Sequence, residues 1–144
     1  MNKILPDKWV RKAIFDRINN IVVDDITIPC YDFIVPNSEN TTAYCLISTQ
    51  TNSELKANKC ESSWQSSVLI DVFTRFNSSG NYASRLLADN IADEVRSKLE
   101  LFSLDAESGL TIVLKTDYFE NDIITQTDNE IVFRKLYRLE LYIN

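Results

Sequence analysis

The sequence contains no histidine, and this absence excludes several kinds of active site. Ser-His-Asp and Cys-His catalytic systems need an imidazole, and so do His-ligated metal centres. Only two of the 144 residues are glycines, Gly80 and Gly109, which are too few for a glycine-rich phosphate-binding loop. The residue types that are present therefore predict a protein that is not an enzyme and has no catalytic residue, no metal and no cofactor.

Cysteine is also scarce, with three residues at Cys30, Cys45 and Cys60. No Cys-x-x-Cys pair occurs, so the spacing matches no metal-binding motif. An odd number of cysteines disfavours a closed disulfide framework. We interpret them as small apolar residues in or near the core of a protein kept in a reducing compartment.

Basic residues are outnumbered by acidic ones, 15 against 21, which gives a formal net charge of −6. A nucleic-acid binder needs a basic face to neutralise phosphates, and an anionic membrane surface makes the same demand. The densest basic cluster, Arg134, Lys135 and Arg138, is small. No apolar stretch is long enough to cross a bilayer, and we expect no membrane partner.

Carboxylate pairs keep an enzymatic alternative open. They occur at Asp24-Asp25, at Asp93-Glu94, and at Glu120 with Asp122. Two carboxylates can do acid–base work or hold Mg²⁺. Because each pair lies in a polar run, we interpret them as solvated acidic faces.

The stretch from Ser63 to Leu101 predicts one strand, a tight turn and one long helix. Apolar residues fall mainly on even positions up to Phe76, with Leu69 and Phe73 as exceptions, which is typical of a strand with one buried face. The turn Asn77–Gly80 follows. From there to Leu101 apolar residues recur every three or four positions with no interrupting Pro or Gly. We expect the helix 81–101 to cross the sheet and bury Leu86, Leu87, Ile91, Val95 and Leu99.

The flanking segments complete a single domain, 1–144. A first helix is expected from Asp7, as its cap, to about Asn20. A central strand is expected at 42–49, followed by a polar excursion over 50–62. Further strands are expected at 110–116 and 131–143, separated by an acidic segment, 117–129. The predicted fold class is α+β: a mainly antiparallel sheet with a long helix packed across one face and an N-terminal helix.

The order of these segments carries a resemblance to a known family. Its residues are Val68–Thr74, the turn Asn77–Gly80, and Ala83–Ala92 leading to Leu99. An acidic stretch and a long strand, from Asp122 to Tyr142, complete it. In this respect the chain resembles the tail-completion and tail-terminator proteins of tailed bacteriophages, which are small α+β domains, and the related neck proteins.

The resemblance implies a structural virion protein that forms a ring at the neck or the head-proximal end of the tail and joins tail to head. Such a ring would be a homo-oligomer, a hexamer or, next to the portal, a dodecamer. Its other partners would be phage tail, portal or neck proteins, and DNA would pass through without specific binding. Assembly would take place in the host cytoplasm. The alternative is a small non-catalytic accessory protein that binds nucleic acid or protein.

The polar segments 50–62 and 117–129 are the expected contact elements, because long polar connections tied to strands can be placed rigidly. The candidate inter-subunit or neighbour contacts are Asn52, Glu54, Lys56, Lys59, Asp117, Glu120, Asp122 and Asp128.

Overall fold

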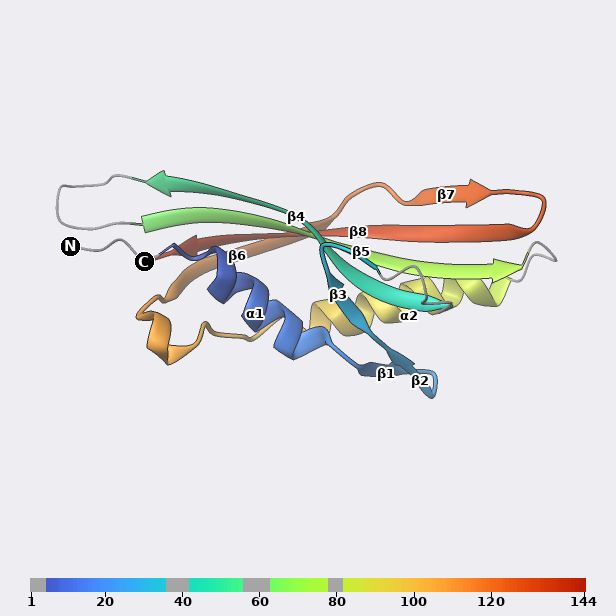
Figure 1. The fold of residues 1–144 in the computed structure, drawn as a ribbon, viewed down its shortest axis with the longest axis horizontal. Helices are drawn as coiled ribbons and strands as arrows, with labels where there is room; N and C mark the ends of the chain where they lie inside the picture. The colour runs from blue at the N-terminus through green and yellow to red at the C-terminus, as the bar shows by residue number, and fades with distance from the viewer. Residues whose placement is uncertain (1–4, 36–41, 56–62, 78–81) are drawn as a thin grey trace.

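Over the residues that the structure describes, the fold is a six-stranded sheet with two α-helices on one of its faces (Figure 1). The computed structural model describes residues 5–35, 42–55, 63–77 and 82–144. The expected turn at Asn77–Gly80 lies mostly outside these residues, and so do Cys60, Lys56 and Lys59.

Three long strands form the middle of the sheet, and shorter strands flank them. The strand order is β3-β4-β5-β8-β6, and β7 pairs with β8 beyond the end of β6. The bounds are β3 (Cys30–Asp32), β4 (Ala43–Leu55), β5 (Ser63–Asn77), β6 (Ile112–Phe119), β7 (Ile123–Gln126) and β8 (Glu130–Ile143).

The expected fold, a mainly antiparallel sheet with a long helix across one face, is wrong in both parts. The sheet is mixed, because β3 runs parallel to β4 with Cys30 opposite Cys45. A period-two pattern is the same in parallel and antiparallel strands, so the sequence did not reveal this. The second helix, α2 (Tyr82–Lys98), has 17 residues and is therefore about 26 Å long. The 15-residue β5 extends to about 50 Å, so α2 covers only part of the sheet.

Basic side chains from other elements meet the chain where α2 ends. Arg17 donates hydrogen bonds to the carbonyl oxygens of Lys98 (3.1 Å) and Leu101 (2.6 Å), and Lys115 Nζ donates to that of Leu99 (2.5 Å). These bonds satisfy carbonyls that a helix end leaves unpaired. Leu101 lies outside the helix and is 81% exposed, and within the helix Leu86 is 45% exposed, although it was expected to be buried.

The first helix, α1 (Asp7–Ile18), packs on β3 and β4. Its N-cap is Pro6, and no side chain caps it, so the expected capping role of Asp7 is wrong. After α1 a two-stranded hairpin forms from β1 (Ile21–Val23) and β2 (Ile26–Ile28). Its two turn residues, Asp24 and Asp25, have φ of 50° and 64°, as a type I′ turn requires.

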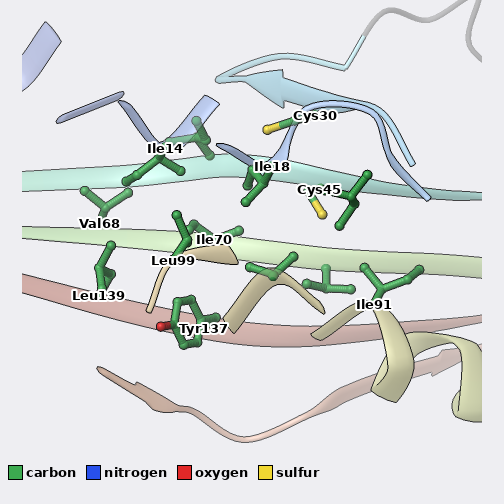
Figure 2. Packing of buried hydrophobic residues seen from close by; sticks show 14 of the residues in the cluster. Ile14, Ile18, Cys30, Cys45, Val68, Ile70, Ile91, Leu99, Tyr137 and Leu139 are labelled. Carbon is green, nitrogen blue, oxygen red and sulfur yellow. The ribbon is translucent and has the colours of Figure 1, made fainter. Parts of the chain in front are cut away.

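The core lies between the helices and one face of the sheet. Figure 2 shows α1 side chains, such as Ile14 and Ile18, together with strand side chains such as Val68, Ile70 and Tyr137. The predicted buried face of β5 is confirmed at Trp64, Val68, Ile70 and Val72. In the part of the chain that the structure describes, no helix covers the opposite face, which we call the helix-free face (Figure 1).

Two expected connections are partly strand. Residues 50–55 continue β4, paired with β5 from Gln50–Val68 to Leu55–Ser63. Within 117–129, β6 continues to Phe119 and β7 adds a second short pairing with β8. The connection after α2 contains a short 3-10 helix, η1 (Ala106–Ser108), which ends at Gly109 with φ of 68°.

Candidate interaction surface

Many titratable side chains in the described residues form ion pairs, and none of those residues form a metal cluster. Across those residues no group of three or more His, Cys, Asp or Glu side chains could hold a metal ion. A groove of about 500 Å³ runs between α1 and residues 101–106. Its charged lining is already paired: Lys12 contacts Asp16 (3.2 Å) and Asp105 (3.5 Å). The groove therefore has no convergent set of unpaired reactive groups.

Asp117 binds two elements to β6. Tyr137 on β8 donates its hydroxyl to Asp117 Oδ2 at 2.5 Å, and Arg96 on α2 lies 3.4 Å from the same oxygen. Burial of the Tyr137 ring, followed by the bond to Asp117, raises the pKa of the phenol. This predicted contact residue thus ties the edge strand to the core of its own chain.

Glu120 and Asp122 lie in the break between β6 and β7, and both pair with β8. Arg138 donates from Nε to Glu120 Oε1 at 2.7 Å and from Nη1 to the Ser67 hydroxyl at 3.0 Å. Lys135 reaches Asp122 at 3.4 Å and Asp89 of α2 at 3.0 Å. The basic cluster noted in the sequence is therefore matched by carboxylates.

The remaining predicted contact residues are separated from these. Asn52 and Glu54 lie near the far end of β4, and Asn52 is opposite Ser66. Asn52 Oδ1 and Ser66 Oγ are both buried without a hydrogen-bond partner among the described residues. Asp128 is exposed in the turn between β7 and β8. The structure thus places Asn52 and Glu54 near one edge of the sheet, and the four predicted acidic contact residues, Asp117, Glu120, Asp122 and Asp128, near the opposite edge.

The helix-free face contains a row of aromatic side chains. Tyr44 stacks on Phe73 with ring centroids 4.5 Å apart, and Tyr31 meets Tyr44 edge to face at 5.8 Å. Arg75 lies 5.3 Å from the Phe73 ring centre. Asp71, two residues before Phe73 on the same face of β5, forms an ion pair with Arg134. The signal that could have found this face is the set of odd positions in β5, which alternate with the buried ones.

The edge formed by β6 and β7, which we call the β6–β7 edge, is unusually apolar. Six of its side chains are at least about one third exposed: Val113, Leu114, Tyr118, Phe119, Ile123 and Ile124. Protein sheets commonly protect such edges with charge or proline, because unpaired strands recruit other strands. Exposed apolar residues gathered on one edge are typical of a protein–protein contact.

Neither described helix is long and apolar enough to cross a membrane. No protein-family model matches the sequence, and no curated protein matches it either. Among solved structures, the chain is similar to one from the virion of a native gene transfer agent particle, with a TM-score of 0.62 and 14% sequence identity. The match covers 97% of this chain and 99% of that chain. At this identity the likeness shows a common fold.

Proposed function

We propose that this chain is a structural, non-catalytic subunit of a tailed phage-like virion. The observation that carries the proposal is the fold shared over nearly the whole length with a chain of a gene transfer agent virion. The site geometry supports it, because Asp117 and Glu120 form ion pairs within the chain and no metal-binding group of side chains occurs in the described residues.

Within the virion we propose a ring at the neck or at the head-proximal end of the tail, where it would join tail to head. The resemblance of the sequence to tail-completion and tail-terminator proteins supports this position. A hexamer is the expected size, with a dodecamer next to the portal as the alternative. The net charge of −6 suits a ring through which DNA slides, because acidic side chains repel phosphates.

The expected contact residues remain part of this proposal. Asp128 and Glu54 lie at the two ends of the sheet, and Lys56 and Lys59 follow Glu54 in the sequence. Asp117, Glu120 and Asp122 are paired within the chain, so replacing them would also loosen the β6–β7 edge. Asp128 is exposed in the turn between β7 and β8, so a variant of Asp128 tests a neighbour contact at that turn.

The experiment is to delete the coding sequence and to examine the particles. We expect the protein in gradient-purified particles of the parent, detected by mass spectrometry of tryptic peptides. Particles made without it should accumulate as separate heads and tails in electron micrographs, and expression in trans should restore joining. Absence of the protein from purified particles would disprove the virion role, and normal particles in the deletion would disprove the joining role.

A further inference from the structure

We propose that copies of this chain associate edge to edge, with the β6–β7 edge of one copy against the β3–β4 edge of the next. This inference deepens the proposed function and rests on it, since it names the surfaces through which the ring would close. The occupant of each edge is a second copy of the same chain.

The β6–β7 edge is the apolar side of this contact. Leu114 is 53% exposed and Ile124 is 51% exposed, and both lie on strands whose outer side has no partner strand in the described residues. No proline interrupts residues 112–126, and the one lysine there, Lys115, is held by the carbonyl of Leu99. Beyond the register shift at the start of β6, the edge has no proline and no outward-reaching lysine to discourage pairing with another strand, and its carboxylates are engaged in ion pairs within the chain.

The opposite edge ends in a strained and exposed aromatic residue. Phe33, directly after β3, has φ of 74°, and Ile34 N–H bonds back to the Asp32 carbonyl at 2.9 Å. This is a γ-turn with positive φ at a bulky residue, a conformation that stores strain and is concentrated at functional sites. Phe33 is 73% exposed and Ile34 is 65% exposed. The turn thus holds two large apolar side chains in water, where a single copy gains nothing from them.

The same edge offers an open length of β4. Strand β3 covers only Cys45–Ile47, so no described strand pairs with the outer side of residues 48–55. The small polar residues Thr49, Thr51 and Ser53 are exposed along this segment. A partner strand could add its backbone hydrogen bonds there, as happens in β-strand addition.

The two edges cannot meet within one chain. Four strand spacings separate β3 from β6, which amounts to about 19 Å. The contact is therefore between copies and joins two different surfaces. Such head-to-tail contacts generate rings when the rotation closes.

Strand direction is compatible with this contact. Successive antiparallel pairs link β4, β5, β8 and β6, so β6 runs antiparallel to β4 of the same chain. Rotation about an axis close to the strand direction preserves that relation between neighbouring copies. The β6 strand of one copy would thus meet β4 of the next as an antiparallel pair, which a standard ladder accommodates.

Sedimentation velocity of the purified chain over a range of concentrations tests the proposal. We expect the wild type to self-associate and both Leu114→Lys and Ile124→Lys to weaken association at least tenfold. Phe33→Gly should weaken it as well, without lowering the thermal midpoint, because glycine adopts positive φ without strain. The matched control is Val22→Lys, which changes a 62% exposed residue of the β1–β2 hairpin and should associate like the wild type.

Mixing variants separates a head-to-tail contact from a symmetric one. Leu114→Lys keeps an intact β3–β4 edge and Phe33→Gly keeps an intact β6–β7 edge, so a mixture should form a dimer that neither variant forms alone. A mixture that stays monomeric would overturn the assignment of the two edges. A wild type that is monomeric throughout, or edge variants that associate normally, would overturn the contact itself. These results would leave the virion role standing, because that role is tested by the presence of the protein in particles.

Discussion

Asp71 and Arg134 form a two-point ion pair across β5 and β8 on the helix-free face. Arg134 donates from Nη2 to Asp71 Oδ2 at 2.5 Å and from Nε to Oδ1 at 3.3 Å. The side chain of Asp71 is only 4% exposed and that of Arg134 is 37% exposed. The bond to Asp71 raises the pKa of Arg134, so the guanidinium keeps its charge. The buried Asp71 carboxylate is therefore stable in its charged form only while the Arg134 guanidinium is present.

Removal of the guanidinium alone should therefore be costly. Arg134→Met leaves the Asp71 carboxylate buried without its counter-ion, and we expect a loss of roughly 3 kcal/mol in the free energy of unfolding. The double variant Asp71→Leu/Arg134→Met should return to within about 1 kcal/mol of the wild type. Urea unfolding followed by circular dichroism measures both. Lys98→Met, which breaks an exposed pair with Glu94, serves as the control and should change little.

Two positions in α2, Leu86 and Ile91, test the orientation of this helix on the sheet. Ile91 is fully buried, and Ile91→Ala should cost roughly 2–5 kcal/mol because it leaves a cavity. Leu86 is 45% exposed, and Leu86→Ala should change stability by less than about 0.5 kcal/mol. Equal losses in the two variants, measured by urea unfolding, would mean that the helix is rotated relative to the sheet.

The pattern of apolar residues predicted the faces of the long strands well. Tyr137, Leu139 and Leu141 of β8 share the buried face at alternate positions, as a half-buried strand requires. Lys135 is the exception on that face, and the sequence could not show that its ammonium would reach Asp89 and Asp122. Pairing partners of a long flexible side chain depend on tertiary structure.

Other features gave no usable signal. Residues 50–55 look like a loop because they are polar on both faces. They form a strand because β5 supplies their backbone hydrogen bonds, and the side chain of Gln50 also bonds to Arg11 and to the Asp7 carbonyl of α1. The sequence also could not predict the parallel pairing of β3, because a strand of three residues is too short to show an apolar pattern. The candidate edges became visible only once the strand order was known.

The turn of the β1–β2 hairpin offers a stabilising substitution. Asp25 has φ of 64°, a conformation that glycine adopts more readily than aspartate. Asp25→Gly should raise the free energy of unfolding by about 0.5 kcal/mol, because relief of strain exceeds the added flexibility of the unfolded chain. Asp24→Gly is the matched comparison and should gain less, because it also loses the hydrogen bond from Asn90 Nδ2 to Asp24 Oδ2 at 3.1 Å. Thermal unfolding followed by calorimetry would rank the two, and a larger gain for Asp24→Gly would contradict the role of Asn90.

The buried thiols predict that stability falls in alkaline solution. Burial, assisted by the nearby charge of Asp32, raises the pKa of Cys30 from 9.0 to about 12. The folded chain therefore keeps this proton above pH 9, whereas the unfolded chain releases it, and fewer protons bound to the unfolded state mean that stability falls as pH rises. The slope contributed by this single group grows from about 0.7 kcal/mol per pH unit at pH 9 toward about 1.4 kcal/mol per pH unit between pH 10 and pH 11. The variants Cys30→Ala and Cys30→Ser lack the thiol, and their free energies of unfolding should fall less steeply by that amount, although Cys45 and Tyr137, whose pKa values are also raised, retain part of the slope. Urea titrations at several pH values measure the slopes, and a slope unchanged in both variants would show that the Cys30 thiol ionises equally in the folded and unfolded chain.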